Sequence, residues 1–176
     1  MDLGPIIVIL IRLLVPFAIF RWPFWGILAA GAVDAFDVVM IDALNMGHFT
    51  QYHSLDKILD TYFLVFAVIV SFRWMALAKW TSVSLFSYRI IGVILFEITK
   101  IRIFLFLFPN LFLYFFMFEA FRQQYFPKWE LTPKRLIIVL LILLIPKMIQ
   151  EYVLHFAELK PWGLFKERFL SSIFKS

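Results

Sequence analysis

The sequence predicts an all-α integral membrane protein, with six transmembrane helices and a C-terminal amphipathic helix at the membrane interface. Its 176 residues are 63% hydrophobic and 16% charged, whereas soluble domains have about 45–50% apolar and about 25% charged residues. Six apolar blocks alternate with segments rich in tryptophan, tyrosine, proline and charge, which suit the headgroup zone. This pattern excludes a water-soluble monomer, and six spans leave no room for a separate soluble domain.

The apolar blocks give the expected spans in chain order. They cover residues 3–20, 24–44, 58–72, 83–96, 103–118 and 136–149, three of them near the minimum length for a span. The expected connections are 21–23, 45–57, 73–82, 97–102 and 119–135. No lysine or arginine precedes the first block, so we interpret it as an uncleaved span. Residues 1–150 are therefore the predicted transmembrane domain.

Residues 151–176 are the predicted interfacial tail. Trp162, Phe165, Phe169 and Ile173 recur at helical spacing among basic residues, which is typical of a helix lying in the interface. Packing of this tail on the protein's own loops is the alternative. The net charge of +5 comes from scattered basic residues, which favours membrane lipids rather than nucleic acid as partners. These residues are divided almost evenly between alternate connections, so the positive-inside rule gives no orientation.

Aspartate is concentrated in one short stretch of the chain. Five of the six aspartates fall between residues 34 and 60, at positions 34, 37, 42, 56 and 60. A carboxylate within or beside a span costs several kcal/mol unless it pairs, faces water or binds an ion. Lys57 alone cannot neutralise five acids, so a divalent cation is the simplest explanation.

The spacing of these aspartates predicts a shared site. Asp34 and Asp37 lie at i and i+3 near the end of the second span, and Asp56 and Asp60 lie at i and i+4 at the start of the third. The connection between them returns the chain to the same side, so four carboxylates are expected to converge. Such an all-oxygen cluster suits Mg²⁺, Mn²⁺ or Ca²⁺ better than zinc.

At these residues the sequence resembles the CDP-alcohol phosphatidyltransferase family, six-helix membrane enzymes with the motif D-x-x-D-G-x-x-A-R-x8-G-x-x-x-D-x-x-x-D. Asp34-x-x-Asp37 matches its first pair and Asp56-x-x-x-Asp60 its second, with one extra residue between the pairs. The resemblance implies a cytoplasm-facing site with two Mg²⁺ or Mn²⁺ ions, held by Asp34, Asp37 and Asp56. It further implies that Asp60 is the base acting on the acceptor alcohol.

The sequence departs from the family motif around these aspartates. Val38 stands for the first glycine, Ile41 for the alanine, Asp42 for the arginine and Tyr52 for the second glycine. The family accommodates cytidine diphosphate at those positions. The metal site is therefore expected to be kept and the nucleotide pocket to be altered.

Three further polar residues are candidates for binding or positioning. Arg89 in the fourth span and Arg12 in the first each need an anion, which the acidic cluster or a substrate phosphate would supply; structural pairing is the alternative. Asn45 continues the Asp34 face and would bind a metal-bound water or a headgroup, or cap its helix.

The expected function is metal-dependent transfer of a phosphate-linked group to a lipid or other alcohol, within phospholipid synthesis. A catalytically inactive relative, serving as a structural subunit of a membrane complex, is the main alternative. An ion or proton transporter is disfavoured, since only Arg12 and Arg89 are charged and deep in the other half of the bundle. A homodimer and a place in a larger membrane complex both stay open.

Overall fold

The computed structural model describes residues 3–43, 52–101 and 103–155, which are helical apart from short connections and contain no strand. The elements are α1 (Leu3–Leu14), the 3₁₀ turn η1 (Val15–Phe17), α2 (Ala18–Arg21), α3 (Pro23–Ala43), α4 (Tyr52–Ser71), α5 (Ala76–Thr99), α6 (Ile103–Leu107), α7 (Leu111–Tyr125) and α8 (Pro133–His155). The predicted helical class is confirmed.

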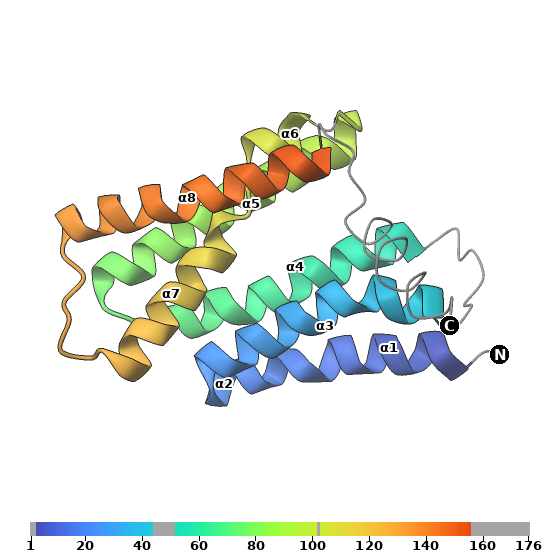
Figure 1. Cartoon of the computed structure of the whole chain (residues 1–176), viewed down its shortest axis with the longest axis horizontal. Coiled ribbons are helices and arrows are strands. Elements are labelled where there is room, and N and C mark those ends of the chain that lie inside the picture. Colours follow the sequence, from blue (N-terminus) through green and yellow to red (C-terminus); the bar gives the residue numbers. More distant parts are fainter. Residues whose placement is uncertain (1–2, 44–51, 102, 156–176) are drawn as a thin grey trace, which may run out of the picture.

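The helices form two groups joined by α7 (Figure 1). In one group α1, α3 and α4 lie side by side, and in the other α5, α6 and α8 pack together. Helix α7 contacts α3, α4, α5 and α8, so its side chains form the centre of the molecule. Phe112, Phe115 and Phe116 of this helix are fully buried.

The expected spans coincide with helical segments, but several boundaries differ. Residues 76–82, expected in a connection, form the first turns of α5, where the Thr81 hydroxyl donates to the Leu77 carbonyl. Helix α7 likewise extends through Glu119 to Tyr125. The tryptophan and charged residues in these two stretches predict connections between helices, but the helices continue through them.

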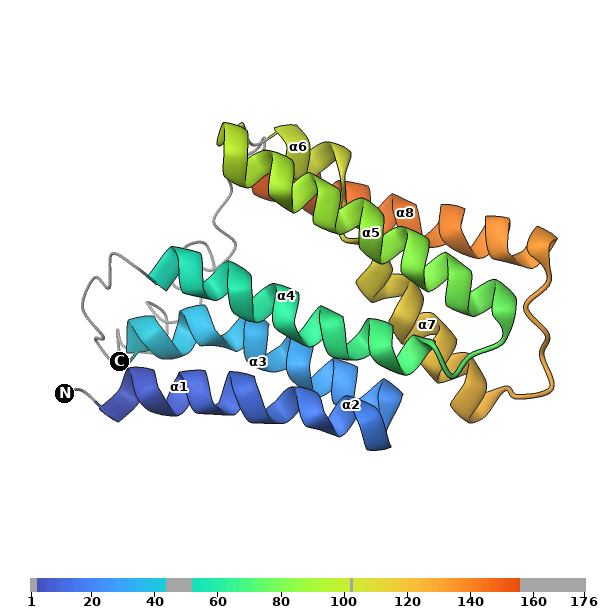
Figure 2. The same ribbon diagram turned by 180° about the vertical axis from the view of Figure 1, so that it is seen from behind.

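The fifth apolar block, expected to be one span, is broken into α6 and α7 (Figure 2). Pro109 lies at the break, and proline both lacks an N–H group and clashes with the preceding turn. The Asn110 side chain accepts a hydrogen bond from the Leu113 amide and so caps α7. The prediction of an uninterrupted helix is wrong here. Proline alone does not decide the outcome, since Pro146 lies inside α8 without ending it; at Pro109 the cap from Asn110 starts a new helix.

Two close helix contacts depend on glycine. A Cβ atom at Gly26 would lie 2.4 Å from the backbone nitrogen of Ile19, so glycine lets α3 fold tightly against α2. A Cβ atom at Gly92 would lie 2.2 Å from Cβ of Phe108, at the break between α6 and α7. Both contacts fix corners of the bundle.

By length and composition, two segments among the described residues are able to cross a membrane: Ala76–Thr99, and Ile103–Tyr125, which comprises α6 and α7. Helix α8 runs to His155, beyond the expected domain boundary at residue 150. The predicted tail helix with Trp162 and Phe165 lies outside the described residues.

Candidate functional site

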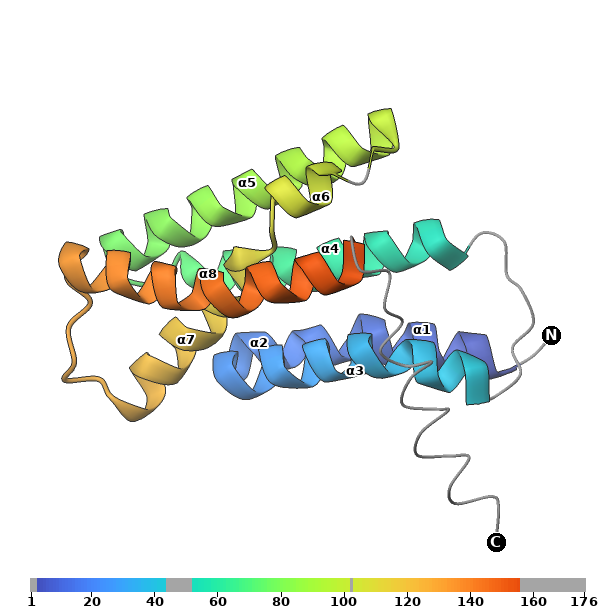
Figure 3. The same ribbon diagram turned by 45° about the horizontal axis from the view of Figure 1, so that its top comes forward.

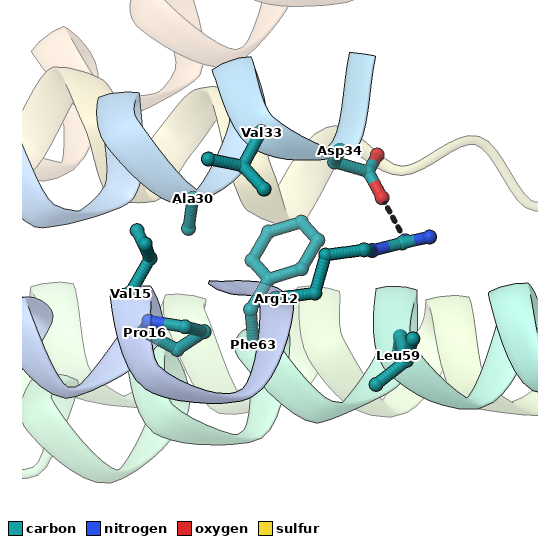
Figure 4. A pocket seen from close by; sticks show the side chains of 8 residues that line it. All are labelled: Arg12, Val15, Pro16, Ala30, Val33, Asp34, Leu59 and Phe63. Atoms are coloured by element: carbon teal, nitrogen blue, oxygen red, sulfur yellow. Dashed lines mark hydrogen bonds and ion pairs between the residues drawn. The ribbon is translucent and has the colours of Figure 1, made fainter. Parts of the chain in front are cut away.

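A small pocket lies where α1, η1, α3 and α4 meet. It has room for about one water molecule and is partly open to the surroundings. Its lining residues are Arg12, Val15, Pro16, Ala30, Val33, Asp34, Leu59 and Phe63, with the two charged side chains at one end (Figure 4). Residues of α1, η1, α3 and α4 therefore line one pocket, and Asp34 is the motif aspartate among them.

The two charged residues of the pocket form an ion pair. The Arg12 Nη2 atom donates to Asp34 Oδ1, joining α1 to α3 (Figure 4). The Arg12 side chain is 3% exposed and that of Asp34 32% exposed. A guanidinium so deeply buried is stable only beside an anion. Arg12 therefore pairs with one carboxylate of the acidic stretch, which fits both the expectation that it faces that stretch and the alternative of structural pairing.

The other three motif aspartates belong to the same two helices. Asp37 follows Asp34 in α3, and Asp56 and Asp60 lie in the first half of α4. The two helices are antiparallel neighbours, so the end of α3 and the start of α4 lie at the same end of the bundle (Figure 1). The side chains of these three residues lie outside the described part of the chain.

Helix periodicity relates these positions to the pocket. Successive residues turn about 100° around a helix, so position 37 of α3 falls between the directions of Ala30 and Val33, which line the pocket. Position 56 of α4 shares a face with Leu59 and Phe63, which also line it. By helix register, positions 37 and 56 therefore share faces of α3 and α4 with residues that line the pocket.

The remaining site predictions have separate outcomes. Asn45 lies outside the described residues. Within the part of the chain that the structure describes, no three Asp, Glu or His side chains are grouped to hold a metal ion. Only Asp34 of the expected ligands has a described side chain, and that side chain pairs with Arg12.

Arg89 belongs to α5 and lies away from this pocket. Its side chain contacts the break between α6 and α7. Its Nη1 atom donates to the Phe108 carbonyl over 2.9 Å, and the neighbouring Tyr88 hydroxyl donates to the Leu107 carbonyl over 2.6 Å. Leu107 is the last residue of α6 and Phe108 follows it, so both carbonyls lack intrahelical partners because the helix stops there. The contacts of Arg89 therefore match the structural pairing that was the alternative to phosphate binding.

A buried charge network in α7 had no place in the sequence-based interpretation. Glu119 is fully buried and accepts hydrogen bonds from Arg122 Nε and Nη2 and from Gln123 Nε2, over 2.7–2.8 Å. Arg122 Nη1 also donates to the Trp129 carbonyl in the α7–α8 loop. The sequence does contain a signal for this network. An acid and a base at i and i+3 within a run of phenylalanines favour mutual pairing.

Comparisons with models of protein families, with curated proteins and with solved structures found no match for this chain.

Proposed function

We propose that the protein is a polytopic membrane protein of six spans that binds a divalent cation at Asp34, Asp37 and Asp56. One observation carries the proposal: a single pocket that contains Asp34 is lined from α1, α3 and α4, and the other motif positions belong to α3 and α4 as well. The membrane location is supported by the two candidate spans and by α8, whose 23 residues extend about 34 Å. Six large apolar side chains on α8 are exposed: Ile137, Ile138, Leu141, Ile142, Ile145 and Ile149.

The chemistry we propose is transfer of a phosphate-linked group to an alcohol, with Asp60 as the base. Phosphoryl transfer depends on positioning and charge neutralisation, which metal ions supply at the attacking and leaving oxygens. Four carboxylates and Arg12 together carry a charge of −3, so one cation leaves the site slightly negative. A second cation is favoured only when a phosphate arrives with it. The proposed site faces the cytoplasm, as the family resemblance implies.

Manganese binding tests the metal site directly. Titration of Mn²⁺ into the detergent-solubilised protein, followed by the electron paramagnetic resonance signal of free Mn²⁺, is expected to show saturable binding. Asp37→Asn and Asp56→Asn should weaken it, whereas Glu130→Gln, an exposed acid at the other end of the bundle, should not. Equal binding by all four proteins would refute the site.

Turnover separates the base from the ligands. With a lipid alcohol acceptor and a nucleotide-activated donor, Asp60→Asn should keep Mn²⁺ affinity yet lose about 10²–10⁴-fold in rate, as expected on removal of a general base. Loss of metal binding in this variant would make Asp60 a ligand instead.

The second candidate function is that of a catalytically inactive subunit of a membrane complex. The ion pair between Arg12 and Asp34 favours it, because a guanidinium already neutralises one expected ligand. Val38, Asp42 and Tyr52 point the same way, since they replace two glycines and an arginine of the family motif. Calorimetric titration with CDP in the presence of Mn²⁺ distinguishes the candidates. Weak or absent binding is expected, and micromolar binding would favour an ordinary transferase.

A further inference from the structure

Every described tryptophan lies toward one end of the bundle. Trp22 and Trp25 flank the corner between α2 and α3, Trp74 and Trp80 the turn between α4 and α5, and Trp129 lies in the α7–α8 loop. These three connections lie at the left in Figures 1 and 3 and at the right in Figure 2. We call this the tryptophan end. Trp22, Trp25 and Trp80 are more than half exposed.

The same end carries a strong excess of positive charge. Its accessible basic side chains are Arg21, Arg73, Lys79, Lys128, Lys134 and Arg135, and its single exposed acid among the described residues is Glu130. Glu119 is also near this end, but it is fully buried against Arg122. None of the ion pairs between described residues involves the six basic residues.

Aromatic rings hold several of these cations at the surface. The Arg135 guanidinium lies 4.9 Å from the centre of the Trp129 ring, and the Lys79 ammonium lies 5.4 Å from that of Trp80. Arg122 fixes the loop below through the Trp129 carbonyl. The basic groups are therefore positioned before any ligand arrives, which reduces the entropy lost on binding.

We propose that the tryptophan end binds the headgroups of anionic phospholipids, with the basic residues contacting phosphate and the tryptophan rings lying at headgroup depth. Amphipathic rings beside basic residues are the side chains that the interface favours, and each basic residue near an anionic leaflet contributes about 1 kcal/mol. The inference rests on the membrane location in the proposed function, but it is independent of metal binding and catalysis.

Quenching of tryptophan fluorescence by lipids tests this inference, because the fluorescent residues lie at the proposed binding surface. In a Trp162→Phe background all fluorescence comes from the tryptophan end. The protein is reconstituted with brominated phosphatidylglycerol or brominated phosphatidylcholine diluted into the unbrominated lipid. We expect phosphatidylglycerol to bind about fivefold more tightly, the ratio that one basic residue near the surface supplies.

Charge removal provides the decisive comparison. The triple variant Lys79→Gln, Lys128→Gln, Lys134→Gln, which removes half of the six cations, should clearly reduce the preference for phosphatidylglycerol, whereas Lys100→Gln, at the far end of α5, should keep it. Adding inorganic phosphate should reduce the preference no more than sodium chloride of the same ionic strength does.

The outcomes separate this inference from the proposed function. Equal quenching of the wild-type protein by both lipids, or an unchanged preference in the triple variant, would overturn headgroup binding alone. Quenching by neither lipid would overturn the membrane location, and the inference with it.

Discussion

Arg122 donates hydrogen bonds to three acceptors at once. Its Nε and Nη2 atoms bind both carboxylate oxygens of Glu119, and its Nη1 atom binds the Trp129 carbonyl. Only a planar guanidinium can reach these three acceptors together, because its donors diverge in a fixed geometry. The residue therefore joins the interior of α7 to the α7–α8 loop.

We expect Arg122→Lys to destabilise the protein by about 2 kcal/mol, since an ammonium group loses the paired contact with Glu119 and the loop carbonyl. The measurement is the apparent midpoint of thermal unfolding in detergent, followed by circular dichroism. Arg21→Lys is the matched control, because Arg21 is exposed and should leave the midpoint unchanged. A similar midpoint for both variants would show that the network contributes little.

The pair formed by Arg12 and Asp34 supports a second prediction. Arg12→Gln leaves the Asp34 carboxylate without its partner and should cost about 3 kcal/mol, the scale for breaking a largely buried pair. The double variant Arg12→Met, Asp34→Leu removes both charges and should recover most of the loss. A double variant less stable than Arg12→Gln would mean that the pair itself stabilises the fold.

At the scale of elements, the break between α6 and α7 is held by α5. Tyr88 and Arg89 donate to the carbonyls at and just after the end of α6, and Gly92, one turn on, leaves room for Phe108. Three features of one helix thus hold the irregular backbone of its neighbour. Nonhelical backbone is tolerated at membrane depth only where its polar groups find partners in the protein.

Gly92→Ala should destabilise this corner by about 1–3 kcal/mol, because the added methyl group would overlap Phe108. Gly31→Ala is the matched control in α3, where no atom lies within 4 Å of the added Cβ. There alanine should stabilise the helix by up to about 1 kcal/mol. Thermal unfolding of the two variants should therefore shift in opposite directions, and equal shifts would argue against a packed break.

The sequence predicts the helices well and their interruptions poorly. Apolar blocks identify each helical segment, since length and composition are local properties. Pro109 is hidden inside a block, and its effect depends on whether neighbours such as Arg89 bond the freed carbonyls. Sequence spacing placed the motif positions of α3 and α4 at one end of the bundle. Sequence spacing could not predict the partner of Arg12, because that contact joins residues 22 positions apart in different helices.

At the scale of the whole molecule, the two ends of the bundle differ in chemistry. The aspartate positions lie near the end of α3 and the start of α4, and the tryptophan end lies opposite them (Figure 1). The aspartates between positions 34 and 60 and the tryptophans are thus separated along the long axis of the helices, whereas basic residues occur at both ends. If the helices cross the bilayer as we propose, the two chemistries face different compartments.

Chemical labelling tests this arrangement, and the absence of native cysteine makes each introduced thiol unique. Met75→Cys and Lys134→Cys, both at the tryptophan end, should react with a membrane-impermeant maleimide from one side of sealed vesicles. Glu97→Cys, near the far end of α5, should react only from the other side or after permeabilisation. Reaction of all three from the same side would contradict the proposed crossing.

The ion pair in the pocket has a consequence for biogenesis. Arg12 lies near the middle of the helical stretch formed by residues 3–21, and an unpaired arginine at such a depth opposes insertion by about 3 kcal/mol. Its partner Asp34 belongs to the next long helix, and Gly26 allows the tight corner between them. Each helix therefore carries the charge that makes the other less costly to bury. If residues 3–43 cross the bilayer as we propose, they are best inserted as a paired hairpin that enters the lipid together rather than one helix at a time.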